Sequence, residues 1–341
     1  MTEALHPPAR LVLTGIGGYL GRHVALTLLG HGYDVTGTLR DLRKADGIRS
    51  ALAAAGAPVE RLRLVAANLM EDRGWAEAFE GAEALVHTAS PFPARNPRDE
   101  AQVTGPAVEG TRRVLHAAAK AGIRRIVLTS SIAAVSYGSG RPPFAETDWT
   151  DPDGPLATPY YRSKTLAERA AWELAAQERL DLTVLNPGMI LGPMIGQTVG
   201  TSVGVLRSLL AGKYPALPDF AVPAVDVRDV AEAHRLALVT PASGGERLIL
   251  AGRPLSMAEI AATLKAVQPE RAAKVPRIVL PTWLARIASR FDPGLAMIAK
   301  ELGRDARVSS AKAERLLGWT MRPQDEMIHD TVASLVAQKM V

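Results

Sequence analysis

The sequence contains no cysteine and few aromatic side chains. Without cysteine, the 341-residue chain can form neither disulfides nor thiolate metal sites, and it has no thiolate nucleophile. Its N-terminal residues, MTEALHPPAR, lack the apolar core of a secretion signal. Because nothing in the sequence demands an oxidising compartment, we predict a cytoplasmic location.

An excess of charge is confined to the end of the chain. Residues 261–341 contain 13 basic and 8 acidic residues, which accounts for the whole net charge of +5. These charges are mixed, and aromatic residues make up only 5% of the chain, so the stacking surface typical of nucleic-acid binding is missing. We predict a solvated basic surface and no nucleic-acid partner.

No long apolar segment is free of turn residues. The longest stretch without charge, residues 182–206, has the length of a bilayer span. However, Asn186, Pro187, Pro193 and Gln197 interrupt it, and this density of turn residues favours a strand followed by loops. The sequence therefore predicts no membrane association.

Short apolar runs alternate with helical patterns through the first half of the chain. We predict strands over residues 10–14, 34–39, 62–67, 84–88, 125–130 and 182–185. We predict helices over residues 19–29, 43–55, 73–80, 99–121 and 158–179, the fourth disturbed at Pro106. Strands that look apolar on both faces indicate a parallel sheet covered by helices, so the fold class is α/β with a doubly wound parallel sheet.

Three glycines lie between the first strand and its helix, in the segment TGIGGYLG. Gly15 permits a tight turn, Gly18 lets the backbone approach a pyrophosphate, and Gly21 lets the helix lie close to the strand. The free N–H groups at the helix N-terminus would hold the anion. This placement predicts a Rossmann-type dinucleotide site with contacts from Thr14, Gly15, Gly17, Gly18, Tyr19, Leu20 and Gly21.

The end of the second strand bears on which nucleotide is bound. The strand leads first to Arg40, whose guanidinium suits the 2′-phosphate of NADP, with Arg43 or Lys44 adding charge. Asp41 offers the competing interpretation, because an acidic residue at this point would bind the ribose hydroxyls of NAD. We predict NADP(H).

The second half of the chain predicts a further lobe. Residues 1–186 form the predicted dinucleotide-binding domain, and strands over residues 224–227 and 247–251 are expected to return to its sheet. Residues 187–223 and 252–341 form the predicted substrate-binding lobe, which is smaller and mostly helical, with one helix over residues 256–267.

A tyrosine and a lysine stand four residues apart at the start of the helix over 158–179. This spacing places Tyr160 and Lys164 on one helical face, whereas Tyr161 has Thr165 four residues on. A nearby ammonium would lower the pKa of the phenol and make it a usable general acid. Ser130 and Ser131 end the fifth strand, where doubly wound sheets bind ligands. We expect Ser130 to satisfy the turn and Ser131 to bind a carbonyl oxygen.

Taken together, these motifs resemble the extended short-chain dehydrogenase/reductase superfamily. The glycine loop, the serine pair, YxxxK, the NP dipeptide at residues 186–187 and DVRDVAEAH at residues 226–234 occur in the order of that superfamily. The segments YYRSKTLAERAAW, RRIVLTSS, HTASPF and GTLRD resemble the dihydroflavonol 4-reductase-like and microbial aldehyde and ketone reductase branch. The resemblance implies that Ser131 polarises the carbonyl, Tyr160 donates the proton, and Lys164 binds the nicotinamide ribose while hydride comes from NADPH.

The resemblance also implies further contacts. Cofactor contacts are expected from Asn68, which replaces the usual acidic adenine contact, and from Leu69, Thr88, Ala89, Ser90, Pro187 and Gly188. An apolar substrate pocket is expected from Pro91, Phe92, Ser136, Met189, Met194 and Ile195. The seven histidines show no metal-ligand spacing, so no metal is predicted and His87 is interpreted as structural.

Two positions separate the branches of the superfamily. Ile132 and Ala133 stand where sugar-nucleotide dehydratases carry an Asp-Glu pair, and Ser136 replaces the asparagine that grips a flavonoid. We therefore predict an NADPH-dependent reductase of hydrophobic or aryl aldehydes and ketones, as a monomer or homodimer. An NAD-dependent sugar-nucleotide epimerase and a regulator that senses NADP without turnover are the alternatives.

Overall fold

The computed structural model describes residues 3–90 and 101–341. Its centre is a seven-stranded sheet, in which every neighbouring pair is parallel and the order is β10-β6-β5-β4-β1-β2-β3. The strands are β1 (Arg10–Thr14), β2 (Asp34–Leu39), β3 (Leu62–Ala66), β4 (Ala84–His87), β5 (Arg125–Thr129), β6 (Asp181–Pro187) and β10 (Arg247–Leu250). The predicted doubly wound parallel sheet is confirmed, and the bounds of β1 and β2 are those expected.

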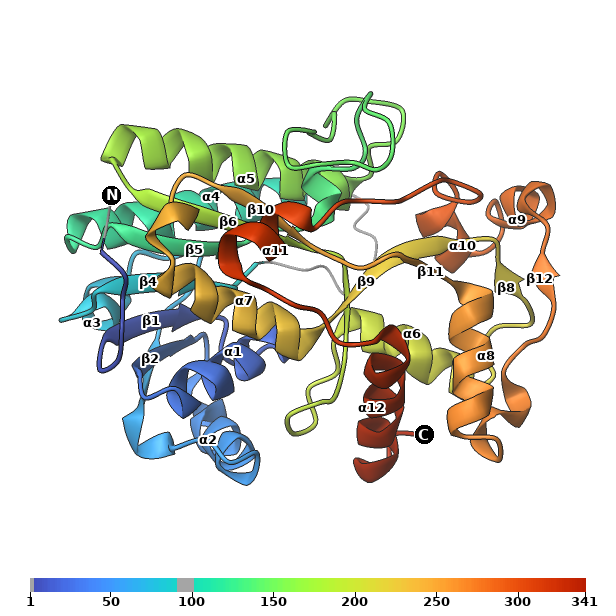
Figure 1. Ribbon diagram of the computed structural model, residues 1–341, viewed down its shortest axis with the longest axis horizontal. Coiled ribbons are helices and arrows are strands. Elements are labelled where there is room, and N and C mark those ends of the chain that lie inside the picture. Colours follow the sequence, from blue (N-terminus) through green and yellow to red (C-terminus); the bar gives the residue numbers. More distant parts are fainter. Residues whose placement is uncertain (1–2, 91–100) are drawn as a thin grey trace.

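Helices cover both faces of this sheet (Figure 1). One layer contains α1 (Tyr19–Gly30), α2 (Ala45–Ala54), α7 (Val227–Val239) and α11 (Ala311–Leu317); the other contains α3 (Trp75–Phe79), α4 (Ala101–Lys120) and α5 (Pro159–Glu178). Side chains alternate along the strands, so Leu11 and Leu13 pack in the first layer while Val12 packs in the second. Both faces are apolar for this reason, as a sheet covered on both sides requires.

Helix α4 continues through Pro106, so the predicted disturbance is not seen as a break in the helix. Pro106 lies in the second turn, where it removes only one of the helical hydrogen bonds. Short 3₁₀ helices connect other elements: η1 (Leu42–Lys44), η2 (Val59–Arg61), η3 (Ile132–Ala134), η4 (Pro241–Ser243) and η5 (Arg271–Lys274).

A second region lies beside the carboxyl ends of the strands, to the right in Figure 1. It contains a three-stranded sheet of β7 (Met189–Leu191), β9 (Ala221–Asp226) and β11 (Pro254–Ser256), and a two-stranded pair of β8 (Leu217–Pro218) and β12 (Val279–Leu280). Its helices are α6 (Thr201–Leu210), α8 (Met257–Val267), α9 (Thr282–Ala288), α10 (Pro293–Ile298) and α12 (Gln324–Ala337). Buried side chains of α6, α8 and α12 share one apolar cluster with those of the small strands.

The two strands expected to return to the large sheet behave differently. Arg247–Leu250 does return, as β10 beside β6. The strand expected over residues 224–227 is found as Ala221–Asp226, but its place in the large sheet was predicted wrongly, because β9 pairs with β7 and β11 instead. Gly188 turns the chain out of the large sheet after β6, so β7 already belongs to the small sheet that β9 joins.

In the described part of the chain, no helix is long and apolar enough to cross a membrane.

Candidate active site

The glycine loop after β1 has the geometry that its sequence predicts. Gly15 has φ +75°, and a Cβ there would lie 2.9 Å from the backbone nitrogen of Ala89. A Cβ on Gly21 would lie 2.1 Å from the carbonyl oxygen of Gly15, so α1 approaches the loop as closely as only glycine allows. The loop therefore lies against the end of β4, at the point where the strand order reverses.

The N-terminus of α1 is open to an anion. Gly18 is the N-cap and has no side chain to accept from the first amide groups, and the first turn carries no acidic residue. These free N–H groups and the glycine cradle fit the pyrophosphate of a dinucleotide. The neighbouring Tyr19 hydroxyl donates to the carbonyl oxygen of Gly192 at 2.8 Å, which holds the following loop of the second region against α1.

At the end of β2, Arg40, which would favour NADP, and Asp41, which would favour NAD, have different surroundings. Asp41 accepts from the backbone N–H and the guanidinium of Arg43, and these hydrogen bonds hold the pKa of its carboxyl below the usual value. Among the described residues, Arg40 makes no side-chain hydrogen bond or ion pair, and it is exposed, as is Lys44. Arg43 is thus occupied by Asp41, whereas Arg40 and Lys44 leave their positive charge available.

The ends of β3 and β4 carry the other expected cofactor contacts. Asn68 is engaged locally, since its amide donates to Glu71 Oε1 at 2.6 Å and its carbonyl accepts from the N–H of Met70. Leu69 lies against Gly110 of α4. Thr88 Oγ1 donates to the carbonyl oxygen of Thr14 at 2.7 Å, so the segment of Thr88, Ala89 and Ser90 is fixed to the end of β1.

His87 lies between the glycine loop and the lysine. Its Nδ1 is 2.7 Å from Thr14 Oγ1, and its Nε2 is buried without a partner in the described residues. Burial, and then the charge of Lys164, lower the pKa of His87 to about 3. The imidazole is therefore neutral, which agrees with its predicted structural role.

The start of α5 places the predicted proton donor. Thr158 is the N-cap and accepts from the N–H of Tyr161 at 3.2 Å, while Pro159 occupies the first turn. Tyr160 consequently lies in the first turn, and its phenol hydrogen-bonds Ser131, the N-cap of η3. Lys164, one turn further, donates from Nζ to Ser90 Oγ at 3.2 Å. The structure thus brings Ser131, Tyr160 and Lys164 together beside the Ala89–Ser90 segment.

The protonation states follow from burial. Burial raises the pKa of Tyr160, although its hydrogen bond with Ser131 acts in the opposite direction. Our expectation that Lys164 lowers this pKa is wrong for this structure, because desolvation of the phenol dominates. Burial also lowers the pKa of Lys164 to about 8, with Glu168 opposing the shift. At neutral pH the phenol is protonated and the ammonium is charged.

A buried polar network behind these residues was missed by the sequence analysis. Glu168 accepts at one oxygen from Ser130 at 2.5 Å and Asn186 at 2.8 Å, and at the other from Arg247 at 2.5 Å. Asn186 also donates to the carbonyl oxygen of Ser131 at 3.1 Å. The network fixes the end of β5 to α5, β6 and β10. Glu168 follows Lys164 by four residues, so the helical spacing that identified Tyr160 could have identified it.

The expected substrate residues are distributed over several places. Pro91 and Phe92 lie outside the described residues. Ser136 is 2% exposed and donates to the carbonyl oxygen of Ile132, while Met189 is half-buried in β7. Met194 packs in the apolar cluster of the second region, and Ile195 packs against the α1 side of the large sheet. Pro187 ends β6, and Gly188 donates to the carbonyl oxygen of Leu250 at 3.0 Å.

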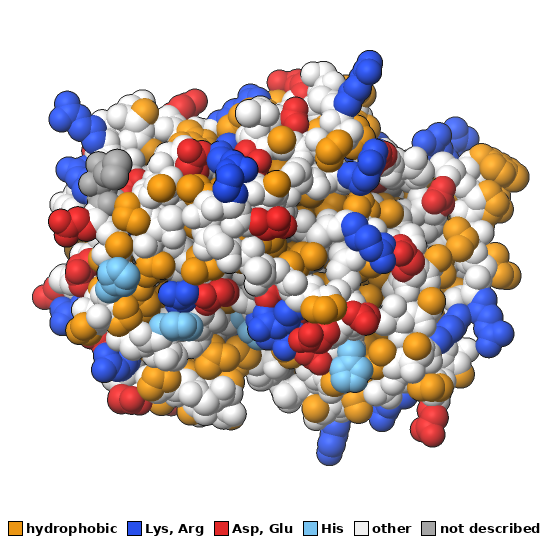
Figure 2. Space-filling view, in the orientation of Figure 1, with side chains coloured by type: hydrophobic (Ala, Val, Ile, Leu, Met, Phe, Trp, Pro, Cys, Tyr) orange, Lys and Arg blue, Asp and Glu red, His pale blue; other side chains and the backbone are white. Residues whose placement is uncertain are grey.

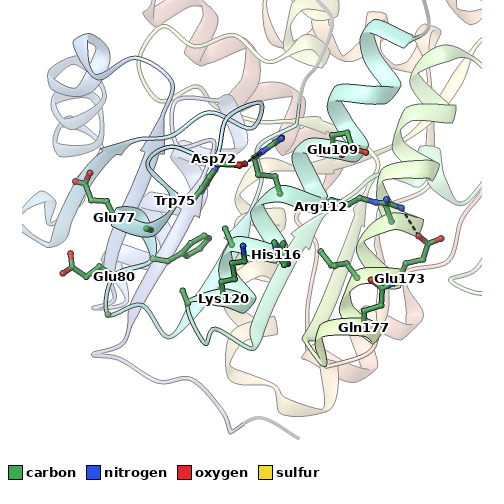
Figure 3. A pocket seen from close by; sticks show the side chains of 18 residues that line it. Asp72, Trp75, Glu77, Glu80, Glu109, Arg112, His116, Lys120, Glu173 and Gln177 are labelled. Atoms are coloured by element: carbon green, nitrogen blue, oxygen red, sulfur yellow. Dashed lines mark hydrogen bonds and ion pairs between the residues drawn. The ribbon is translucent and has the colours of Figure 1, made fainter.

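An open groove of about 1040 Å³ lies away from these residues, among α3, α4 and α5 (Figure 3). None of the predicted site residues lines it, and two of its arginines are paired with carboxylates of the same groove: Arg112 with Glu173 and Arg113 with Asp72. The candidate active site is therefore formed by the polar groups that converge at the carboxyl ends of the strands, and this groove is separate from it.

Two further features concern surface charge and metal ligands. Over the face shown in Figure 2, Lys and Arg side chains are interspersed with Asp and Glu and form no single-sign patch. Within residues 3–90 and 101–341, no group of three His, Asp or Glu side chains is placed to hold a metal ion.

Known proteins are similar to this chain in sequence and in fold. The NAD dependent epimerase/dehydratase family matches residues 11–251. Cinnamoyl-CoA reductase 1 of Petunia hybrida is 37% identical over 271 residues, which cover 76% of this chain and 77% of that protein. Tetraketide alpha-pyrone reductase 1 of Arabidopsis thaliana is 31% identical over 338 residues and 96% of each chain.

Solved structures extend this likeness to the whole molecule. Yeast methylglyoxal/isovaleraldehyde reductase Gre2, complexed with NADPH, has a TM-score of 0.79 and 25% identity and covers 97% of this chain and 100% of its own. Vestitone reductase from alfalfa has a TM-score of 0.76 and 25% identity, with 97% and 99% covered. The chain belongs to the NAD dependent epimerase/dehydratase family of extended short-chain dehydrogenases/reductases, on its reductase branch.

Proposed function

We propose that this protein reduces a hydrophobic or aryl aldehyde or ketone to the alcohol with NADPH. The observation that carries the proposal is the convergence of Ser131, Tyr160 and Lys164 beside the cofactor loop. The names of its relatives, which include cinnamoyl-CoA reductases and Gre2 in complex with NADPH, support reduction of a carbonyl group.

The chemistry assigned to each residue follows from its protonation state. When bound, NADPH supplies the hydride. Ser131 orients the substrate by donating a hydrogen bond to its carbonyl oxygen, which also polarises the bond. Tyr160, kept protonated by burial, gives its proton to the same oxygen as negative charge develops there. Lys164 holds a positive charge beside Ser90, where it stabilises the phenolate left on Tyr160 until solvent restores the proton.

The choice of NADPH rests on the end of β2. Arg40 and Lys44 are exposed cations without a partner among the described side chains, whereas Asp41 is engaged by Arg43. An ionised carboxylate that already accepts two guanidinium hydrogen bonds is a poorer acceptor for ribose hydroxyls, and a free guanidinium suits a phosphate.

Two other functions are less well supported. Elimination on a sugar nucleotide needs acid–base groups next to the catalytic serine, and Ile132 and Ala133 are buried apolar residues there. A regulator that only senses NADP has no need of a proton donor. We further propose that the substrate binds between the dinucleotide domain, formed by residues 1–186 with α7, β10 and α11, and the second region, formed by the small strands with α6, α8, α9, α10 and α12. Small carbonyl compounds in the cytoplasm are the proposed partners.

The test is consumption of NADPH with a panel of aromatic aldehydes, followed by the absorbance of the reduced nicotinamide. We expect wild-type protein to consume NADPH and Tyr160→Phe to be at least about 100-fold slower, since a general acid contributes roughly 10²- to 10⁴-fold. Tyr214→Phe, at an exposed tyrosine, is the matched control and should retain activity. Equal rates for Tyr160→Phe and wild type would refute the role of Tyr160, and binding of NADPH without turnover would favour the regulator.

A further inference from the structure

The chain after α10 contacts both segments that carry the catalytic hydroxyl groups. Lys300 Nζ donates to the carbonyl oxygen of Ala157 at 2.8 Å, just before the N-cap of α5. Arg304 Nη2 donates to the carbonyl oxygen of Ser136, which lies shortly after Ser131 and η3. Glu301 lies between these two contacts and is 7% exposed. A segment distant in sequence is thereby joined to the two arms of the active site.

The carboxylate of Glu301 binds two tyrosines, one on each arm. Tyr137 donates its hydroxyl to Oε2 at 2.7 Å, and Tyr161 donates its hydroxyl to Oε1. The two phenol rings stack, with centroids 3.9 Å apart and planes inclined by 16°. Both tyrosines are buried, with Tyr137 7% and Tyr161 9% exposed, so bulk water does not replace Glu301 as the acceptor for their hydroxyl groups.

Each tyrosine adjoins a catalytic residue. Tyr161 follows Tyr160 on α5, and their rings meet edge to face with centroids 5.9 Å apart. Tyr137 is joined to η3 through Thr150. The hydroxyl of Thr150 accepts from the N–H of Tyr137 at 3.0 Å and donates to the carbonyl oxygen of Ala133, within η3, at 2.7 Å. Ser131 is the N-cap of η3. Displacing either ring would therefore displace Tyr160 or the backbone that carries Ser131.

The cluster is electrostatically consistent. The guanidinium of Arg304 lies 4.5 Å from the centre of the Tyr137 ring and supplies the positive charge beside the buried carboxylate. Burial and the adjacent Glu301 raise the pKa of Tyr137 well above its usual value, so its hydroxyl stays a donor. A shared acceptor for two buried hydroxyls is needed, since each would otherwise be left unsatisfied.

We infer that Glu301 is a positioning residue for proton transfer: by binding Tyr137 and Tyr161 together, it fixes the distance between Ser131 and Tyr160. The inference rests on the proposed reductase function and adds to it a residue that does not touch the reacting atoms. It also assigns a role to Tyr161, which has no charged partner at the i, i+4 spacing. That role depends on its hydrogen bond with Glu301, 140 residues away in the sequence.

The test compares kcat and the KM for NADPH in Tyr161→Phe, Tyr137→Phe and Glu301→Gln. Each Phe variant keeps the stacked ring and removes one hydrogen bond. We expect kcat to fall roughly 5- to 50-fold in Tyr161→Phe and Glu301→Gln, since a misplacement of about 1 Å can cost around 100-fold. The KM for NADPH should stay within about two-fold, because the glycine loop is untouched. Tyr33→Phe, which removes another buried tyrosine's hydrogen bond, to the carbonyl oxygen of Leu5, controls for lost stability and should leave kcat unchanged.

A mutant cycle shows whether Glu301 acts through the tyrosines. In the Tyr137→Phe/Tyr161→Phe background we expect Glu301→Gln to change kcat by less than about two-fold, because the hydroxyls it positions are gone. Wild-type kcat in both Tyr161→Phe and Glu301→Gln would overturn the inference, as would a full effect of Glu301→Gln in the double Phe background. If the wild type is active and the variants keep its kcat, this inference alone is overturned. If the wild type binds NADPH but reduces no carbonyl compound, the proposed function is overturned as well.

Discussion

Among single side chains, Lys164 gives the sharpest pH prediction. Its buried ammonium has a pKa of about 8, while burial raises that of Tyr160. Reduction needs the ammonium charged and the phenol protonated, so we expect kcat to be constant below about pH 7 and to fall as pH rises through about 8. The measurement is kcat against pH at saturating NADPH and aldehyde.

A matched variant identifies the group whose titration lowers kcat near pH 8. Lys164→Arg replaces the ammonium by a guanidinium that does not titrate in this range, so whatever activity remains should lose the decline near pH 8. If the wild-type profile instead stays flat to pH 10, the phenol alone controls the rate and the assignment to Lys164 is wrong.

We expect Arg40 to decide the choice of cofactor. Because its guanidinium is exposed and unpaired among the described residues, we expect Arg40→Ala to weaken NADPH binding at least about 10-fold while changing NADH binding little, as loss of a charge-assisted phosphate contact costs roughly 1.5 to 3 kcal/mol. Arg63→Ala, on the exposed surface of β3, is the control. Titration of both nucleotides by fluorescence measures the effect, and equal weakening of the two would remove the phosphate-binding role.

Residues that share an element were predictable, and residues joined across the fold were not. The spacing of Tyr160 and Lys164 lies within one helix turn, and the structure brings both to the same site. Tyr161 has no polar partner four residues away, yet it binds Glu301, which only the tertiary fold brings near. The direction of the Tyr160 pKa shift was also beyond the sequence, since it is set by burial in the folded protein and opposed only by the hydrogen bond with Ser131.

At the scale of elements, the glycine loop and α1 form one unit. A Cβ on Gly21 would overlap the carbonyl oxygen of Gly15, which is backbone and cannot move aside cheaply. We expect Gly21→Ala to destabilise the protein by about 1 to 3 kcal/mol and to weaken NADPH binding at least 10-fold. Urea unfolding and nucleotide titration provide the two measurements.

The same helix offers the control. Gly30, at the other end of α1, has nothing within 4 Å of an added Cβ, and its φ is not in the left-handed region. Gly30→Ala should be neutral or stabilise by up to about 1 kcal/mol, because alanine loses less backbone entropy. Similar losses in both variants would mean that the close approach at Gly21 is not the cause.

Elements with a strong periodic signal were predicted well. The buried-strand pattern RLVLT marked β1, and the segment DVTGTL between two helical patterns marked β2, both at their observed bounds. The strands β7, β8 and β11 have two or three residues each, too few for any period. Gly200 caps helix α6 and Gly204 lies within it, so residues 201–210 resembled a loop. These shorter elements are specified by packing in the second region more than by local propensity.

For the whole molecule, three buried histidines predict sensitivity to acid. His23, His87 and His234 have pKa values of about 4, 3 and 4, because burial disfavours their charged form. The unfolded chain takes up these protons near pH 6.5 and the folded protein does not, so stability is complete above about 6.5 and declines as pH falls towards 4. Each histidine contributes up to about 1.4 kcal/mol per pH unit in that window.

Urea unfolding at pH 7, 6 and 5 measures this decline. His234→Gln should make it shallower, because one buried group no longer takes up a proton on unfolding, whereas His116→Gln, on the exposed surface of α4, should not. An unchanged slope in His234→Gln would assign the decline to other groups.

The position of β10 has a consequence for synthesis of the chain. Strand β6 is complete at Pro187, but its outer neighbour begins only at Arg247, after β7, β8, β9, α6 and α7. At a translation rate of roughly 5 to 20 residues per second, the outer edge of β6 stays unpaired for several seconds. During that interval the nascent protein presents bare amide and carbonyl groups to other chains, so chaperone supply during translation should influence the yield of this reductase more strongly than its final stability does.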